Sequence, residues 1–318
     1  MRPVDEVARV GVVVVHFGDI RPTLACVEAV RRDSSSCFRR IVVVDNGVSL
    51  GSDSVPGAEI VSLRANEGFG AGANAGVAAL GGGPWAALVI LNNDVEVVDG
   101  YLDGAVGALS RRAVGLAGGP LYLDRPGGML WYAGGGVNWL TGTVRQSTSR
   151  RAATRRRTAG FVPGAAFAVK AEAWHQVGGF DPGYFLYNED VDLCLRLRRR
   201  RWRLLYEPRM VAVHRLGAVT GSASRSPFYL EHMTATRLWP FRPFAYRVYL
   251  AFLHTNYVVL RAFAYRLVVR GEGGRESSRA LLRGHRRALS TLRFVSGRGD
   301  VGAGGVTDSL GTGRQTGG

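Results

Sequence analysis

Carboxylates are concentrated at two points of the chain instead of being scattered over one face. Glu189, Asp190 and Asp192 occupy three of four consecutive positions, between an aromatic run and a stretch rich in arginine. Asp94 follows one strand-like run, and His214 closes another. Acids at strand ends and helix starts indicate metal-ion and proton chemistry on a phosphorylated donor. The alternative for Glu189 and Asp190 is that they complement the positive end of a helix dipole.

Strand and helix patterns alternate along the first part of the chain. Four runs of aliphatic and β-branched residues predict strands at residues 9–17, 41–46, 60–63 and 86–91. Helical spacing over 20–31 and 71–80 lies between them, which predicts an α/β fold with a parallel sheet flanked by helices. His16, Asp45 and Asp94 then fall at the carboxyl ends of strands, where such sheets collect ligands.

The second half of the chain reads differently. Residues 114–170 predict short strands and glycine turns, and the five arginines within residues 150–157 predict a mobile loop. A helix is expected over 191–203. The apolar stretch 241–270 is interrupted by arginines, so it does not predict a membrane span. It predicts either a helix lying in a membrane interface or one packed on the catalytic domain. Residues 297–318 predict a disordered tail.

Composition narrows the class of protein. The chain has 318 residues and a formal net charge of +16, and Lys170 is its single lysine. This charge indicates affinity for polyanions such as nucleotide diphosphates, anionic lipid headgroups or nucleic acid. Cys26, Cys37 and Cys194 form no CxxC pair, so neither a disulfide framework nor a zinc site is predicted. With no signal peptide visible, we expect a cytoplasmic protein, at the inner face of the cell membrane if the interface helix forms.

Seven short motifs follow one another between about Val10 and Arg237. They lie at residues 12–17, 42–47, 66–76, 91–95, 178–181, 188–196 and 213–214. In this order and at this spacing they resemble the family 2 glycosyltransferases, especially the branch of bacterial rhamnosyltransferases and galactofuranosyltransferases.

The resemblance implies an A-type glycosyltransferase fold, with a Rossmann-like mixed sheet flanked by helices. Residues 1–110 would form the nucleotide-sugar-binding half and 111–237 the acceptor-binding and catalytic half of the same domain. A basic amphipathic helical extension, 238–296, would follow. The implied reaction is inverting transfer from a nucleotide-diphosphate sugar, with dTDP-rhamnose or a UDP-sugar favoured. The acceptor would be a hydroxyl of a glycan, a lipid-linked sugar or a natural product.

The resemblance also implies donor-binding positions. Asp45 would read the nucleobase or ribose, although it could instead cap the following turn. His16 and Phe17 would wall the base, and Arg64 would lie near the base and diphosphate. The other donor-binding positions that we expect are Gly68, Asn74 and Asn93. The glycine-rich stretch that contains Gly68 follows the third strand, so it predicts a helix entry beside the diphosphate rather than a dinucleotide fingerprint.

A metal site is implied at Asp94, which corresponds to the metal-binding acid of the family's DxD motif. A divalent cation, Mg²⁺ or Mn²⁺, would neutralise the charge that builds on the departing diphosphate. The first acid of the motif is replaced by Asn92, whose amide oxygen is a weaker ligand. His214 would complete the metal shell, or serve as a structural histidine at the end of its strand.

Asp190 is the expected catalytic base, and Glu189 is the alternative base or a partner that orients Asp190. Asp192 is expected to pair with an arginine of its own helix. Trp131 and Gly164 fall in segments expected to border the acceptor cleft, although a core aromatic and a tight turn would explain them equally well.

Two other functions compete with sugar transfer. A basic nucleic-acid-binding protein would explain the charge, but the chain lacks the helix-turn-helix, zinc-finger and RRM signatures. A nucleotidyltransferase is disfavoured because the first strand-to-helix turn has no glycine-rich loop with a lysine. We therefore expect no nucleic-acid partner.

Overall fold

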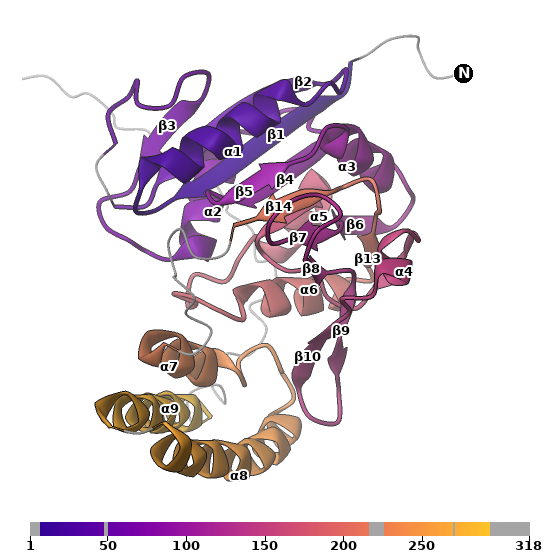
Figure 1. Cartoon of the computed structure of the whole chain (residues 1–318). Helices are drawn as coiled ribbons and strands as arrows, with labels where there is room; N and C mark the ends of the chain where they lie inside the picture. The colour runs from indigo at the N-terminus through magenta and orange to yellow at the C-terminus, as the bar shows by residue number, and fades with distance from the viewer. Residues whose placement is uncertain (1–6, 48–49, 216–225, 270, 293–318) are drawn as a thin grey trace, which may run out of the picture.

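An eight-stranded mixed sheet forms the centre of the computed structural model, which describes residues 7–47, 50–215, 226–269 and 271–292 (Figure 1). Its strand order is β11-β13-β6-β12-β4-β1-β2-β3. The strands are β1 (Arg9–His16), β2 (Phe38–Asp45), β3 (Glu59–Ser62), β4 (Ala87–Asn92), β6 (Val114–Gly118), β11 (Arg157–Ala159), β12 (Ala166–Val169) and β13 (Arg203–Tyr206).

The strands β3, β2, β1 and β4 run parallel, as their buried aliphatic runs predict. The register pairs His16 with Asp45 and Val15 with Asn92, so these strands end along one edge of the sheet. Strand β12 is antiparallel to both β4 and β6, which makes the sheet mixed. The carboxyl-end edge that the sequence predicts is therefore present.

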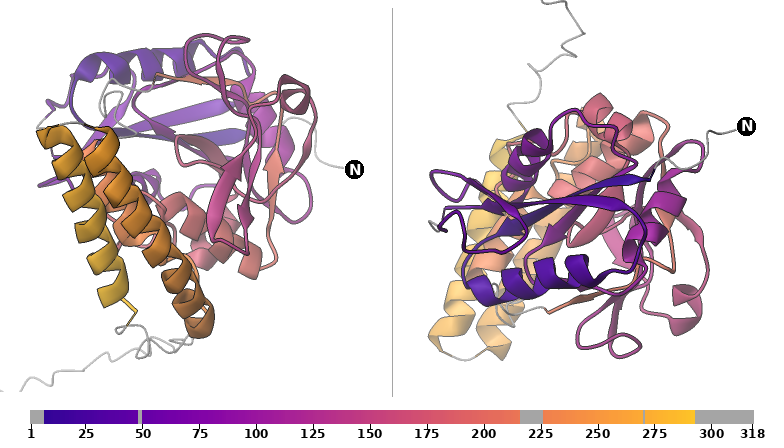
Figure 2. Two further views of the ribbon diagram at one scale, coloured as in Figure 1. Left: turned by 60° about the horizontal axis from the view of Figure 1, so that its bottom comes forward. Right: turned by 90° about the horizontal axis from the view of Figure 1, so that it is seen from above.

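Helices cover both faces of this sheet. Helices α1 (Ile20–Arg32) and α3 (Tyr101–Leu109) lie on one face, whereas α2 (Phe69–Leu80), α5 (Ala171–Val177) and α6 (Glu189–Arg199) lie on the other (Figures 1 and 2). Helix α1 begins where Asp19 accepts a hydrogen bond from the backbone of Arg21 at 2.9 Å. Helix α2 lies close to the sheet because Gly76 faces β1, where a Cβ atom would overlap Val13.

A second sheet brings a distant strand to the end of β4. Its order is β5 (Val95–Val97), β14 (Ala212–His214), β7 (Leu121–Tyr122) and β8 (Leu130–Tyr132). The antiparallel register of β14 and β5 pairs His214 with Val95. His214 is thereby placed beside Asp94, although the two residues lie far apart in the sequence. A hairpin of β9 (Gly135–Asn138) and β10 (Thr143–Gln146) extends from this region.

Three helices form a separate layer below the sheet in the view of Figure 1: α7 (Pro227–Thr236), α8 (Phe244–Val268) and α9 (Glu272–Ser290). Helices α8 and α9 lie side by side (Figure 2), and Thr255 Oγ1 lies 2.9 Å from Nε2 of His285 between them. Within the described residues, no helix is both long enough and apolar enough to cross a membrane.

The prediction of a mobile loop over residues 150–157 is wrong. This segment forms the short helix α4 (Arg150–Ala153) and leads into β11. The Arg150 guanidinium donates to the carbonyls of Gly127 and Gly128 at 2.8 and 2.9 Å, and the Arg157 guanidinium lies 4.3 Å from the Tyr206 ring centre. Carbonyls and a ring from other elements thus bind arginines that the sequence placed in a mobile loop. The expected tail, 297–318, lies outside the described residues.

Candidate active site

A cavity of about 1030 Å³ opens at the carboxyl-end edge of the sheet. Asp94 and His214 line it, and so do Glu189 and Asp190. On the other side the cavity extends to α7, where Arg237 is among its lining residues. The two acidic clusters of the sequence therefore share one cavity.

Asp94 and His214 form the first half of the site. Oδ1 of Asp94 lies 3.1 Å from Nε2 of His214, and both side chains are buried. Among the described residues this oxygen has no hydrogen-bond partner, although Nε2 of His214 is close to it. Oδ1 of Asp94 and Nε2 of His214 can both bind a metal ion. A divalent cation between these two atoms would satisfy both. The Trp131 ring packs edge-on against His214, with ring centres 5.3 Å apart.

The rest of a metal shell must come from other groups. In the part of the chain that the structure describes, no three His, Cys, Asp or Glu residues cluster as metal ligands. Asn92 ends β4 and lines the cavity, so its amide oxygen is available there. A cation at Asp94 and His214 would take its remaining ligands from Asn92, water and the oxygens of a bound diphosphate.

Asp190 and Glu189 begin α6 and form the second half of the site. Asp190 accepts hydrogen bonds from the backbone N–H groups of Gly164, at 2.9 Å, and Val191, at 2.8 Å. Burial raises the pKa of Asp190, while these two donors counteract the rise. Burial and, next, the charge of Asp190 raise the pKa of Glu189. Oε2 of Glu189 is buried without a hydrogen-bond partner among the described residues.

These environments assign different protonation states to the two carboxyl groups. Asp190 has two N–H donors that stabilise its charged form, whereas Glu189 would have to ionise beside it in a buried position. Asp190 therefore ionises first, and Glu189 retains its proton. This difference favours Asp190 over Glu189 as a proton acceptor.

The loop before α6 holds these acids in place at a cost in backbone energy. Tyr187 and Asn188 both have left-handed φ angles, of 68° and 66°, which costs about 1–3 kcal/mol for each residue. Asn188 Nδ2 donates to Oγ1 of Thr236 at 2.9 Å, and this hydroxyl donates to the carbonyl of Tyr187 at 2.9 Å. Helix α7 thus stabilises the strained loop that presents Glu189 and Asp190 to the cavity.

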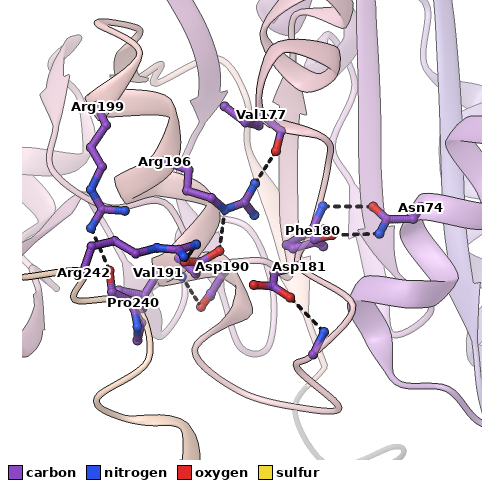
Figure 3. Close-up of polar contacts among 12 residues, drawn as sticks. Asn74, Val177, Phe180, Asp181, Asp190, Val191, Arg196, Arg199, Pro240 and Arg242 are labelled. Atoms are coloured by element: carbon purple, nitrogen blue, oxygen red, sulfur yellow. Dashed lines mark hydrogen bonds and ion pairs between the residues drawn. The ribbon is translucent and has the colours of Figure 1, made fainter. Parts of the chain in front are cut away.

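Arginines fix the body of α6. Asp192 forms an ion pair with Arg196, so the predicted pairing within its own helix is confirmed. Arg196 also donates to the carbonyl of Val177 at 2.7 Å, and Arg199 donates to that of Pro240 at 2.9 Å (Figure 3). These contacts join α6 to the end of α5 and to the segment that leads into α8.

The whole α/β region matches one family of enzymes. The model of the family described as Glycosyltransferase like family 2 matches residues 8–237. The chain is a family 2 glycosyltransferase. A relative, the N-acetylglucosaminyl-diphospho-decaprenol L-rhamnosyltransferase of Mycobacterium tuberculosis, is 30% identical over 219 residues, which are 60% of this chain and 71% of that protein. Rhamnosyltransferase WbbL of Escherichia coli is 47% identical over 51 residues, 16% of this chain and 19% of that protein. The resemblance to the rhamnosyltransferase branch is confirmed.

Solved structures confirm the A-type fold of the glycosyltransferase. Mannosyltransferase PcManGT from Pyrobaculum calidifontis, in complex with GDP-Man and Mn²⁺, matches with a TM-score of 0.52 and 14% identity, over 89% of this chain and 87% of that one. GalNAc-T7 with UDP, GalNAc and Mn²⁺ matches with a TM-score of 0.52 and 16% identity, over 66% of this chain and 44% of that one.

Several expected donor-binding residues of the glycosyltransferase line the cavity. Phe17 is partly exposed at the end of β1, and Asn93 donates to its carbonyl at 3.3 Å. Gly68 has a left-handed φ of 93°, and a Cβ atom there would overlap the carbonyl of Phe185. Gly164 and Trp131, the expected acceptor-side residues, also line the cavity.

Four other expected donor-binding residues are not among the lining residues of the cavity. Nδ1 of His16 lies 2.6 Å from Oγ1 of Thr23, and Asp45 accepts from the backbone of Leu50 at 2.7 Å, which is the turn-capping alternative. Asn74 makes two hydrogen bonds of 2.9 Å with the backbone of Phe180 (Figure 3). Arg64 lies exposed on the surface.

Two asparagines that the sequence analysis did not select, Asn46 and Asn66, line the cavity beside Gly68. Asn46 Nδ2 donates to Oδ1 of Asn66 at 3.0 Å and to the carbonyl of Gly68 at 3.2 Å. Each lies in one of the seven motifs: Asn46 directly follows Asp45, and Asn66 lies two residues before Gly68. Their place in those motifs was the available signal.

Proposed function

We propose that this enzyme transfers a sugar, with inversion, from a nucleotide-diphosphate sugar to an acceptor hydroxyl, using Asp190 as base. One observation supports this most: Asp94 and Asp190 line the same cavity, about 1030 Å³ in volume. Direct displacement needs a leaving-group site and a base within reach of one sugar ring, and a cavity of this size holds a nucleotide sugar.

Asp190 would accept the proton of the acceptor hydroxyl as that oxygen forms its bond to the anomeric carbon. The bond to the diphosphate breaks at the same time, and the diphosphate leaves with the electron pair. The N–H groups of Gly164 and Val191 orient the Asp190 carboxylate, and protonated Glu189 adds no second charge beside it. Asp94, His214 and Asn92 would hold Mg²⁺ or Mn²⁺, which when bound offsets the negative charge of the departing diphosphate.

The names of the relatives guide the choice of substrates. Both named relatives are rhamnosyltransferases, which favours dTDP-rhamnose as donor over a UDP-sugar. The name of the mycobacterial relative includes a diphospho-decaprenol, which favours a lipid-linked acceptor over a free glycan or a natural product. The alternative, nucleic-acid binding, rests on the net charge of +16 and on arginine runs such as residues 150–157. In the structure Arg150 and Arg157 of this run contact carbonyls and a ring of the chain itself.

A panel of nucleotide sugars tests the proposal. We expect the purified enzyme with Mg²⁺ to turn over dTDP-rhamnose or one UDP-sugar, and NMR of the product to show the opposite anomeric configuration from the donor. Retention of configuration, or no turnover of any member of the panel, would contradict it.

We also propose that the enzyme works in the cytoplasm at the inner face of the membrane, attached through α8. Val248, Phe252, Val259, Phe263 and Leu267 recur at helical spacing along one side of α8, and each is between 46% and 70% exposed. We call these residues the apolar stripe. Such a continuous exposed stripe is typical of an interface or membrane contact.

The neighbouring helix supplies the charge that favours a lipid surface. Arg275, Arg279 and Arg286 are exposed on α9 at spacings of 4 and 7 residues, so they lie along one side of that helix. The apolar stripe of α8 and the arginines of α9, two helices that pack against each other, would complement the acyl chains and headgroups of anionic lipids. A protein partner would have to offer carboxylates to these arginines instead. In that case the enzyme would not bind vesicles of anionic lipid.

The enzyme should co-sediment with vesicles that contain phosphatidylglycerol at low salt, and less at high salt because the electrostatic part of binding is screened. Replacing Phe252 and Phe263 together with serine should remove most of the binding. Met129→Ser, at an exposed site away from α8, is the matched control and should bind like the wild type. Equal binding of the double variant, or no binding of the wild type, would contradict attachment through the apolar stripe.

A further inference from the structure

Arg237 directly follows α7 and lines the cavity. It is the single arginine or lysine among the described lining residues, whereas Asp94, Glu189 and Asp190 line the cavity as well. The cavity thus has carboxylates where it meets the sheet and α6, and one cation where it meets α7.

No described carboxylate forms an ion pair with Arg237. Its guanidinium carbon lies 5.5 Å from the ring centre of Tyr257, with which it also forms a side-chain hydrogen bond. The other groups that face it are Tyr229, His254 and the cation of Arg261, and none of them is a carboxylate. Burial, more than any neighbour, lowers the pKa of Arg237. By contrast, the well-buried Arg196 has Asp192 as its partner. A largely desolvated guanidinium without a counter-charge is costly, and an anionic ligand would remove that cost.

The guanidinium of Arg237 lies apart from the site expected for the donor diphosphate. The loop before α6 contacts the donor end through Phe185, which packs against Gly68. At its other end Asn188 bonds to Thr236, the residue before Arg237. The α6 loop, with Asp190 two residues after Asn188, therefore runs between the donor end and α7.

We propose that Arg237 binds a phosphate of the acceptor, so that the acceptor is a sugar phosphate or diphosphate ester whose hydroxyl reaches Asp190. This inference rests on the proposed function. A guanidinium is suited to this task because its fork of N–H groups can donate two parallel hydrogen bonds to phosphate oxygens. Phe228, Met233 and Phe241 line the same end of the cavity, and they would accept an apolar chain attached to the phosphate.

Three acceptors test the proposal: N-acetylglucosaminyl citronellyl diphosphate, N-acetylglucosamine 1-phosphate and the neutral octyl N-acetylglucosaminide. With Arg237→Gln, KM for both phosphorylated acceptors should rise about 10- to 100-fold, the value of a lost charge-assisted contact. KM for the neutral glycoside should change little. Arg237→Lys should recover part of the loss. A wild-type preference for the citronellyl ester over the 1-phosphate would identify a lipid diphosphate rather than a free sugar phosphate as the source.

Arg261→Gln is the matched control, because Arg261 stacks on Tyr257 and Tyr265 near Arg237 but does not line the cavity. We expect this variant to keep the wild-type KM for all three acceptors. Equal losses on neutral and phosphorylated acceptors, or a rise in the KM of the donor, would overturn the role of Arg237. Failure of the wild type to turn over any nucleotide sugar, with or without acceptor, would instead overturn the proposed function itself.

Discussion

Replacing Asp190 with asparagine should lower kcat for sugar transfer by about 10²- to 10⁴-fold, the range that a positioned general base contributes. The amide has the size of the carboxyl group and fits beside the backbone N–H groups of Gly164 and Val191, but it cannot take the acceptor proton. Donor affinity should stay near the wild-type value because the proposed base does not contact the nucleotide. Steady-state kinetics and calorimetry with the donor would measure the two quantities separately.

Glu189→Gln is the matched control for this variant. Because Glu189 is expected to hold its proton, glutamine replaces one neutral hydrogen-bonding group with another of the same size, and most of kcat should remain. A large loss in Glu189→Gln together with a small loss in Asp190→Asn would exchange the two roles and make Glu189 the base.

The pH profile gives an independent readout of the same carboxylate. Burial raises the pKa of Asp190 above its ordinary value, so this group gains its proton at a higher pH than an exposed aspartate does. Only the deprotonated form can act as base, and kcat/KM of the wild type should therefore fall as the pH decreases through that raised pKa. The residual activity of Asp190→Asn should lack this fall.

The parallel half of the sheet could be predicted because its strands carry a purely local signal. Strand β1 is buried on both faces, so Val12 to Val15 need no alternation with polar residues. The segment from Arg150 to Arg157 failed for the opposite reason. Its partners, the carbonyls of Gly127 and Gly128 and the Tyr206 ring, come from other elements, and no pattern within the segment reports them.

The same distinction applies to the site. Asp94 and Asp190 were selected because acids at a strand end and a helix start are visible in sequence. Asn74 was selected from a motif, but its amide is used to hold the backbone of Phe180, a contact 106 residues away. Arg237 was not selected, because one arginine among 41 basic residues carries no signal until the fold shows which one lines the cavity without a carboxylate.

Removal of divalent cations should lower transfer by at least about 100-fold, since a cation beside a departing diphosphate supplies several kcal/mol of charge stabilisation. EDTA would remove the ion, and Mg²⁺ or Mn²⁺ would restore activity. Asp94→Asn should shift the Mn²⁺ concentration for half-maximal activity upward, because the variant replaces a carboxylate ligand with an amide. His214→Ala should do the same through loss of its imidazole ligand.

The control for these variants is Asp103→Asn, whose exposed carboxylate lies in the first turn of α3. It should need no more Mn²⁺ than the wild type. If Asp94 and His214 hold the same cation, the double variant should lose less affinity than the two single losses combined, because either change alone already opens the shared site. Full activity in EDTA would remove the metal role of both residues, and additive losses would mean that Asp94 and His214 act apart, despite the 3.1 Å between Oδ1 and Nε2.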